Sequence, residues 1–292
     1  MGFENRPATK AELAQMKHLL EEGMKAGAIG LSIGLLYSPG RYSSKEELAE
    51  LCEVLPAYNG LFSTHIRGEG NHLIESIQEV IWIAEKAGIS LHISHLKAAG
   101  KRNWGLVSQA LEMIEDSRAR GFDVTCDVYP YEAGSTMLST VLPPWTLEGG
   151  MEQCLERLSQ PDVRERIKQE LSVEQEDWDN LVASTGWDSV IISAVSPKNE
   201  HLEGESIASI SERLGKDPCE TVLDLLLQED GNVSIVFFHM ANEDVEHVLQ
   251  SDYSLIISDS LGCSTGKPHP RTYGTFPRIF DTYVREKKDF IA

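Results

Sequence analysis

Apolar residues follow two different spacings along the first 130 positions of the chain. Over residues 10–26 they recur every three or four positions, which is the period of an amphipathic helix. Residues 28–36 and 61–66 instead form short apolar runs that are typical of buried strands. The alternation continues, and it predicts further helices at about 44–59, 71–87 and 103–119 and further strands at 89–95 and 122–128. The pattern therefore predicts repeated βα units.

Local signals mark the ends of these helices. Thr9 followed by Glu12 is a capping box, so the first helix is expected to begin at Lys10. A glycine separates each helix from the next strand, because glycine adopts the left-handed conformation of a helix cap without steric cost. These residues are Gly27, Gly60, Gly88 and Gly121. Strands that alternate with helices at intervals of about 30 residues pair in parallel, so a barrel or a doubly wound sheet is expected.

The regular spacing ends after residue 130, where proline and glycine pairs interrupt it between residues 143 and 150. Helical segments near 150–159 and 161–172 follow and are interpreted as an insertion. Beyond them the pattern predicts strands at 188–195, 233–238 and 254–258 and helices at 205–214, 217–229 and 243–250. We therefore divide the chain into barrel βα units at 1–140, a helical insertion at 141–187, and the remaining barrel units with a terminal helix at 188–292, all in one catalytic domain.

Charge and cysteine content restrict the partners and the compartment. The formal charge of −20 leaves no basic footprint, so no nucleic acid or anionic membrane is expected as a partner. The five cysteines are scattered and never in C-x-x-C spacing, which argues against a disulfide framework: Cys52, Cys126, Cys154, Cys219 and Cys263. No apolar run approaches the roughly 18 residues that span a bilayer, and no signal peptide follows Met1. We therefore expect a cytoplasmic protein.

Three predicted strands end on a side chain that can bind a metal or transfer a proton. Alternation from Leu91 and Ile93 places His95 on their face. Two other strands end on His65 and Asp259. In a parallel barrel the carboxyl ends of all strands open on one face, so the three side chains are expected to converge. Imidazole nitrogens and carboxylates are usual zinc ligands, and a zinc site with an open position can activate water.

Six further histidines are interpreted as structural. His92 points to the face of its strand opposite to His95. His239 also ends a predicted strand, but a lone histidine of this kind is commonly a hydrogen-bonded core residue. The others fall in predicted helices or loops and are His18, His72, His201 and His247.

Six segments of the chain carry the most specific functional signal. They are STHIR around His65, ISHLK around His95, DVYPYEAGST, LPPWTLEGG, SDS around Asp259 and HPRTYGTFPR. In this order they resemble motifs of the N-acyl-D-amino-acid deacylases (D-aminoacylases) of the amidohydrolase superfamily, from about Met1 to Glu286. The resemblance implies a zinc-dependent parallel (β/α)8 TIM barrel. It also implies hydrolysis of the amide bond of small N-acyl-D-amino acids to a D-amino acid and a carboxylate.

The resemblance also assigns roles to individual residues. It implies that His65 and His95 hold one tightly bound zinc, with room for a second, weaker metal site, and that Asp259 is the catalytic carboxylate. Asp259 could take a proton from water and pass it to the leaving amine. The residues implied around the substrate carboxylate are Lys97, Tyr129, Ser135 and Arg271. Arg271 offers a planar fork for that carboxylate and Lys97 a point charge.

Two features of the family do not occur in this sequence. The superfamily carries an H-x-H metal pair on its first barrel strand, and this subfamily adds a metal-bridging cysteine on an early strand. We therefore expect an incomplete barrel that lacks its first strands. The alternative hypothesis is a catalytically silent fragment or subunit that needs the missing half. An open barrel exposes sheet edges and its apolar lining, so we expect the isolated chain to be oligomeric or poorly soluble.

Overall fold

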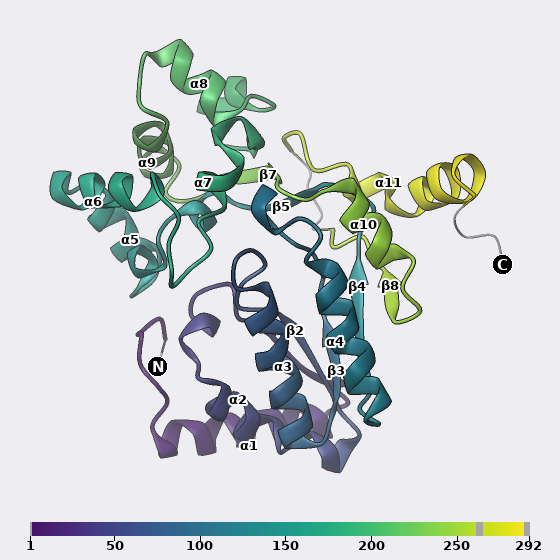
Figure 1. The fold of residues 1–292 in the computed structure, drawn as a ribbon. Coiled ribbons are helices and arrows are strands. Elements are labelled where there is room, and N and C mark those ends of the chain that lie inside the picture. Colours follow the sequence, from purple (N-terminus) through teal and green to yellow (C-terminus); the bar gives the residue numbers. More distant parts are fainter. Residues whose placement is uncertain (1, 261–264, 289–292) are drawn as a thin grey trace.

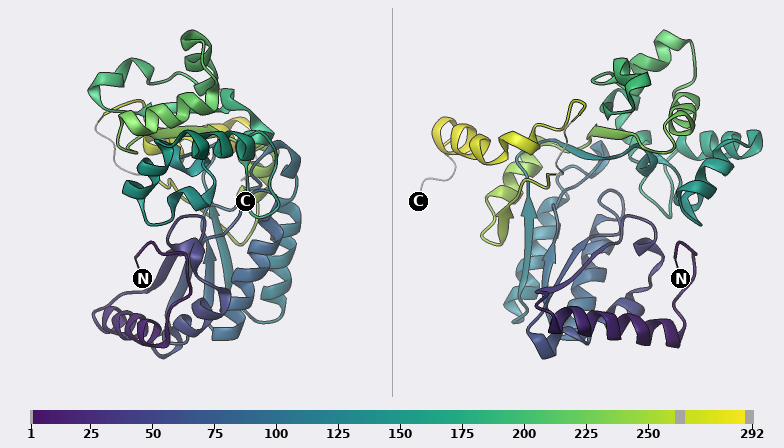
Figure 2. Two further views of the ribbon diagram at one scale, coloured as in Figure 1. Left: turned by 90° about the vertical axis from the view of Figure 1, so that its left-hand side faces the viewer. Right: turned by 180° about the vertical axis from the view of Figure 1, so that it is seen from behind.

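The computed structural model describes residues 2–260 and 265–288, so Cys263 lies outside the described residues. Its architecture is α/β with a parallel sheet, as the sequence predicts. The described strands form a five-stranded parallel sheet of order β1-β2-β3-β4-β8 and a three-stranded antiparallel sheet of order β5-β7-β6. Figures 1 and 2 show the antiparallel sheet and its helices above the carboxyl ends of the parallel strands, with α1 at the opposite end.

The amino-terminal part of the chain builds four of the five parallel strands. Its elements are α1 (Lys10–Lys25), β1 (Gly30–Gly34), α2 (Lys45–Cys52), β2 (Leu61–His65), α3 (Leu73–Ala87), β3 (Ser90–Ile93), α4 (Val107–Ala119) and β4 (Val124–Val128). The capping box of Thr9 and Glu12 is present at the start of α1. Gly88 has φ of 68° at the end of α3, as a left-handed cap requires.

Gly60 has a different role from the one that the sequence predicts. Asn59 takes the left-handed conformation at φ of 52°, and Gly60 follows it. A Cβ at Gly60 would lie 2.9 Å from the Met24 side chain and 3.2 Å from that of Leu55. Glycine is therefore required at this position by close packing between α1 and the start of β2.

Helices cover one face of the parallel sheet and leave the other face open. Phe62, Leu91 and Ile93 are fully buried in the core cluster that also holds the apolar faces of α3 and α4. The pairing register places Ser32, Ser63, His92 and Thr125 in one row across the opposite face. The members of this row are half-buried or exposed, so the polar face of the sheet is uncovered by the described residues.

The strands predicted at 188–195 and 233–238 do not belong to the parallel sheet. They are β6 (Val190–Ala194) and β7 (Ser234–Phe238), and both pair in antiparallel fashion. β7 also pairs with β5 (Ala133–Met137), which the sequence analysis missed because its AGSTM segment lacks an apolar run. The expectation that these segments are parallel barrel strands is wrong. Apolar periodicity identifies a strand but does not fix the direction of its partner.

A second hydrophobic core lies under the antiparallel sheet. It draws on buried residues from Leu138 to Phe237. The helices around it are α5 (Met151–Leu158), α6 (Pro161–Leu171), α7 (Leu181–Thr185), α8 (Ile207–Leu214) and α9 (Pro218–Gln228). The amino-terminal segment contacts this part of the chain, because the Phe3 carbonyl accepts a hydrogen bond from the Gly149 N–H at 3.0 Å.

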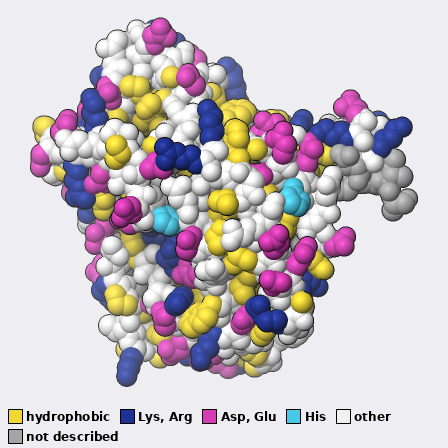
Figure 3. Space-filling model, in the orientation of Figure 1, with side chains coloured by type: hydrophobic (Ala, Val, Ile, Leu, Met, Phe, Trp, Pro, Cys, Tyr) yellow, Lys and Arg dark blue, Asp and Glu magenta, His cyan; other side chains and the backbone are white. Residues whose placement is uncertain are grey.

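The chain then returns to the parallel sheet. α10 (Asn242–Leu249) packs against β4 and β8 (Ser254–Ile256), and α11 (Arg271–Arg278) continues into a π-helix at Ile279–Glu286 that projects from the body in Figure 1. None of the helices in the described ranges has the length and apolar character needed to cross a membrane. Figure 3 shows Lys and Arg side chains interspersed with Asp and Glu on the face it presents.

The two faces of the parallel sheet should respond differently to truncation of an apolar side chain. Leu91 is fully buried, whereas Leu255 in β8 is 57% exposed. We expect Leu91→Ala to lower the free energy of unfolding by about 2–5 kcal/mol, because it opens a cavity in the core. Leu255→Ala is the matched control and should change it by less than about 0.5 kcal/mol. Urea denaturation followed by circular dichroism measures both, and equal effects would contradict this assignment of the faces.

Candidate metal and substrate site

A cavity of about 680 Å³ lies between the carboxyl ends of the parallel strands and the antiparallel sheet. All seven residues predicted from the sequence line it: His65, His95, Lys97, Tyr129, Ser135, Asp259 and Arg271. Its other wall is apolar and includes Val141, Leu142 and Phe237. The structure therefore brings residues that are as much as 206 positions apart in the sequence to one partly open cavity.

The two histidines meet at the edge of this cavity. His65 is the last residue of β2, and its Nδ1 lies 2.5 Å from Nε2 of His95. The two ring centroids are 4.4 Å apart. At this separation the two ring nitrogens contact each other directly, which brings two possible zinc donors together at one place.

Strand alternation does not explain this meeting. His65 shares the open face of the sheet with Ser63 and His92, whereas Ile93 points to the helix-covered face. β3 ends at Ile93, and His95 has φ of 40°, in the left-handed region. This conformation is uncommon for a residue with a side chain. The turn redirects the His95 ring from the helix-covered face to His65.

Asp127 at the end of β4 holds this turn in place. Its Oδ1 accepts a short hydrogen bond from the backbone N–H of His95. Its Oδ2 lies 2.7 Å from Nε2 of His92, whose Nδ1 lies 2.8 Å from Oγ1 of Thr125. His92 thus has partners for both ring nitrogens and serves to orient Asp127.

Glu69 lies behind His95, on the side away from His65. Its Oε1 is 3.0 Å from Nδ1 of His95 and 2.7 Å from Nζ of Lys97. All three side chains are buried, with at most 9% of each side chain exposed. Nζ of Lys97 also lies 2.5 Å from Nδ1 of His95, so this ring nitrogen is shared between a carboxylate that only accepts and an ammonium that only donates. Lys97 is therefore already paired, and its ammonium is not free to hold a substrate by itself.

The charges in this cluster depend on one another. Burial opposes ionisation of Glu69, but Lys97 and His95 outweigh burial and hold the pKa of Glu69 well below its usual range. Burial, and then the neighbouring His95, lower the pKa of His65. His65 is therefore a neutral imidazole at neutral pH, which is the form that binds a metal.

Asp259 lines the cavity and, like His95, has a left-handed backbone conformation. β8 ends at Ile256, and Asp259 has φ of 45°, so the expected strand alternation does not extend to it. Its Oδ2 lies 2.8 Å from Nη1 of Arg271, whose side chain is only 5% exposed. Nη2 of Arg271 donates to the Ser135 carbonyl at 3.2 Å. The Arg271 guanidinium thus orients the Asp259 carboxylate and fixes it to β5.

Tyr129 and His269 both contact Arg271. The guanidinium lies 4.7 Å from the Tyr129 ring centre, and Nζ of Lys97 lies 5.8 Å from it. Burial raises the pKa of the Tyr129 hydroxyl, which stays protonated. His269 donates from Nε2 to the Ala133 carbonyl at 2.9 Å and accepts the Arg271 N–H at Nδ1, and burial lowers its pKa to about 4. His269 is therefore a neutral structural residue.

Three residues of the site were not among the candidates from the sequence. Glu69 and Tyr37 line the cavity, and Asp127 holds the turn at His95. Glu69 sits in the segment Arg67-Gly68-Glu69-Gly70 directly after a strand, which is a signal that could have identified it. Tyr37 lines the cavity, and burial raises the pKa of its hydroxyl to about 12.

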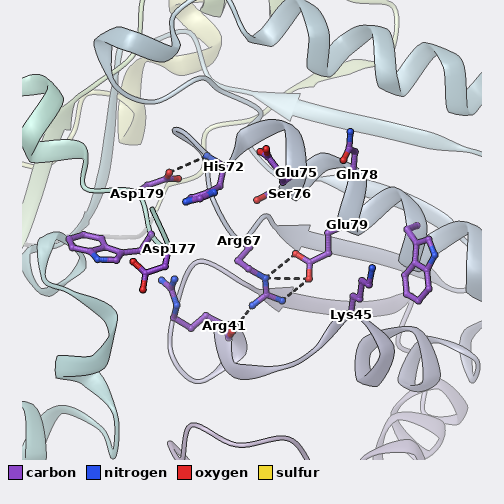
Figure 4. Close-up of a pocket in the computed structure, with 12 residues that line it drawn as sticks. Arg41, Lys45, Arg67, His72, Glu75, Ser76, Gln78, Glu79, Asp177 and Asp179 are labelled. Carbon is purple, nitrogen blue, oxygen red and sulfur yellow. Dashed lines mark hydrogen bonds and ion pairs between the residues drawn. The ribbon is translucent and has the colours of Figure 1, made fainter. Parts of the chain in front are cut away.

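A second hollow of about 500 Å³ adjoins the cavity on the outer side of the loop after β2 (Figure 4). Arg67 is fully engaged there, because it pairs with Glu79 at 2.8 Å and donates to two backbone carbonyls. Asp179, from the segment before α7, accepts the N–H groups of Gly70 at 2.8 Å and of His72 at 3.2 Å. The helical insertion is thus anchored to the loop that carries Glu69.

Comparison with known proteins finds similar enzymes that are about twice as long as this chain. No protein-family model matches the chain. The chain is 33% identical to a D-aminoacylase of Alcaligenes xylosoxydans xylosoxydans over 281 residues, which are 96% of this chain and 48% of that protein. It is 29% identical to an N-acyl-D-glutamate deacylase of the same organism over the same share of each chain. Over nearly its whole length the chain is thus similar to D-aminoacylases and N-acyl-D-amino-acid deacylases.

Solved structures of such enzymes agree with the fold. A crystal structure of D-aminoacylase superposes with a TM-score of 0.73 at 30% identity and covers 98% of this chain and 50% of that chain. N-acyl-D-glutamate deacylase from Bordetella bronchiseptica, complexed with zinc and a phosphonate mimic of the tetrahedral intermediate, superposes with a TM-score of 0.76 at 27% identity, over 97% and 49%. The chain spans about half the length of these relatives.

Breaking the buried ion pair from one side should be strongly destabilising. We expect Glu69→Ala to lower the free energy of unfolding by about 3–5 kcal/mol, because it leaves the Lys97 ammonium buried without a partner. The double variant Glu69→Leu with Lys97→Met removes both charges and should cost less than Glu69→Ala alone. Asp281→Ala, in an exposed ion pair with Arg285, is the control and should cost less than about 0.5 kcal/mol. Urea denaturation at pH 7 distinguishes these outcomes.

The buried ion pair of Glu69 and Lys97 also predicts that the stability of the chain depends on pH. The folded pKa of Glu69 is below its unfolded value, so its contribution is present above the unfolded pKa and is lost as pH falls toward the folded pKa. The difference in unfolding free energy between the wild type and the double variant should therefore be constant from about pH 6 to 8 and shift against the wild type below about pH 4. A difference that does not change between pH 7 and pH 3 would contradict an ionised Glu69.

Proposed function

We propose that this chain contributes to a zinc-dependent amidohydrolase that cleaves the amide bond of N-acyl-D-amino acids. The observation that carries the proposal is the approach of His65 Nδ1 and His95 Nε2 to 2.5 Å in the wall of a partly open cavity. Support comes from the relatives, one of which is described with zinc and a mimic of the reaction intermediate. A D-aminoacylase relative is described with a binuclear metal centre in which one metal activates and the second attenuates.

The donor set fits zinc in kind but not in number. Zinc–imidazole bonds are about 2.0–2.1 Å long, so a small opening of the two rings would admit an ion between the nitrogens. Within residues 2–260 and 265–288, no group of three or more His, Cys, Asp or Glu side chains is arranged to hold a metal. We therefore propose that this chain supplies two ligands, His65 and His95. Water and residues outside this chain supply the rest, for one tightly bound zinc and a weaker second metal.

The side chains of this chain would supply proton transfer and substrate binding. When bound, zinc lowers the pKa of water and polarises the substrate carbonyl. Asp259 is placed to accept a proton on its carboxylate and to return it to the leaving nitrogen, which amide cleavage requires. Its ion pair with Arg271 at 2.8 Å holds the carboxylate in one orientation. We assign Lys97, Tyr129, Ser135 and Arg271 to the wall that receives the substrate carboxylate.

We further propose that the parallel sheet is part of a (β/α)8 barrel whose other strands are not in this chain. β1 and β8 are the two edges of the described sheet, and the row from Ser32 to Thr125 on its open face is uncovered. An alternative is a catalytically silent fragment or subunit, which the two-ligand metal site favours. Unpaired edges also support our expectation of oligomers. The free, buried cysteines fit a cytoplasmic setting.

Zinc content and turnover of the purified chain separate these two functions. We expect zinc to bind with His65 and His95 as ligands, so that a His65→Ala variant loses it. Hydrolysis of N-acetyl-D-methionine by the chain alone would exclude the silent fragment. Absence of turnover that is restored by adding a segment with the missing strands would show that the chain is not self-sufficient.

A substitution at Asp259 tests the division of labour. Asp259→Asn keeps the size of the side chain but removes its proton affinity. In any active form we expect this variant to retain zinc and to lose hydrolysis by about 100-fold or more. Zinc is measured by metal analysis and hydrolysis by release of D-methionine. Loss of zinc with the fold intact would instead make Asp259 a main metal ligand.

A further inference from the structure

His239 has the properties of a binding residue rather than those of a core histidine. It follows β7, and only 6% of the residue is exposed, yet it lines the cavity. Its backbone is fixed from three directions. The N–H donates to the Glu132 carbonyl at 3.3 Å, and the carbonyl accepts the Gly100 N–H at 2.8 Å and the Trp104 Nε1–H at 3.2 Å. The ring is therefore held rigidly at the cavity wall.

The hydrogen bonding of the His239 ring is incomplete. Nδ1 is buried, and it has no hydrogen-bond partner among the described residues. Burial lowers the pKa of His239 to about 3, so the ring is neutral and carries one N–H. A buried N–H without a partner is rarer in proteins than an acceptor without one. We therefore assign the hydrogen to Nε2, which makes this nitrogen a donor.

Gly134 in β5 leaves a space between this nitrogen and the Tyr129 hydroxyl. A Cβ at residue 134 would lie 3.1 Å from His239 Nε2 and 3.3 Å from Tyr129 Oη. Within the described part of the chain, Tyr129 Oη makes no hydrogen bond, although the residue is only 2% exposed. Two donors that lack protein acceptors thus border one small space that a side chain at residue 134 would fill.

Lys97 and Arg271 cannot bind a substrate carboxylate by themselves. Lys97 is paired with Glu69 at 2.7 Å, and Arg271 is paired with Asp259 at 2.8 Å. A carboxylate that enters the cavity therefore needs further donors, and neutral N–H and O–H groups supply them without adding charge. The Arg271 guanidinium, 4.7 Å from the Tyr129 ring, keeps the local potential favourable for an anion.

We propose that His239 Nε2–H and Tyr129 Oη–H form a two-donor site beside Gly134 that binds a carboxylate oxygen of the N-acyl amino acid or of its amino acid product. The proposal rests on the proposed function for the identity of the ligand. It adds His239 and Gly134 to the residues that hold the substrate. It requires no metal, so it can be tested on the metal-free chain.

The test compares an acid with its amide. The probes are N-acetyl-D-methionine and N-acetyl-D-methioninamide, titrated calorimetrically into the EDTA-treated full chain. The wild type should bind the acid at least about tenfold more tightly, because only the acid offers an anionic acceptor. His239→Leu and Tyr129→Phe each remove one donor and should each weaken acid binding about tenfold. His239→Gln retains an N–H of similar reach and should stay within about threefold of the wild type.

Two further variants control the comparison. Gly134→Ala fills the space between the donors and should also lose acid binding, since residue 134 is outside the left-handed region and its backbone accepts alanine. His201→Leu replaces an exposed histidine outside the cavity and should bind as the wild type does. Where His239→Leu does not fold, long-range ¹H–¹⁵N spectra of the wild-type rings give the answer. The His239 Nε2 signal, assigned by its loss in His239→Gln, should shift with the acid and not with the amide.

Each contrary result has a definite meaning. Equal binding of acid and amide, undetectable acid binding by the wild type, or full acid binding by His239→Leu or Tyr129→Phe would overturn the proposal. Failure of the proposed function gives a different pattern, because zinc and turnover would then be absent while the acid-specific binding remains. If the wild type hydrolyses the substrate and His239→Leu binds the acid as tightly as the wild type does, only this inference fails and the proposed function stands.

Discussion

The site depends on the neutralisation of charge among buried side chains. Lys97 is buried in the loop after β3, and a buried ammonium is tolerated only beside an anion, which Glu69 supplies. Glu69 comes from the loop after β2, so this ion pair joins the ends of two neighbouring strands. The same carboxylate contacts Nδ1 of His95 at 3.0 Å and leaves Nε2 for His65. Electrostatic compensation and ligand orientation are thus achieved by one side chain.

The cavity has two walls with different origins. The polar wall comes from the carboxyl ends of parallel strands, where His65 is the last residue of β2 and short turns place His95 and Asp259. The apolar wall comes from the antiparallel sheet and the helical insertion. Two residues outside strands, His95 and Asp259, adopt left-handed backbone conformations that direct their side chains inward. Reactive groups are therefore held by strained turns on a rigid sheet, as is common at functional sites.

The sequence predicted the parallel sheet and the helices that cover it because their apolar periodicity is strong and local. It also predicted which side chains would share the cavity, but partly for the wrong reason. Alternation would direct His95 toward the helix-covered face, and only the turn at φ of 40° brings it to His65. The antiparallel pairing of β6 and β7, and β5 itself, depend on contacts between distant segments. The pairing of Glu69 with Lys97 and the unpartnered Nδ1 of His239 could not be predicted, because contacts and burial are properties of the folded chain.

The anchoring of the insertion by Asp179 has a consequence for how such a protein can change over evolution. A Cβ at Gly68 would lie 2.8 Å from the Asp179 carboxylate, and one at Gly70 would lie 3.0 Å from it. The loop that carries Glu69 therefore has almost no freedom to accept larger residues. The apolar wall, by contrast, is built on a separate core. Substitutions in the apolar wall can therefore change the shape of the cavity while the loop that carries Glu69 keeps its conformation.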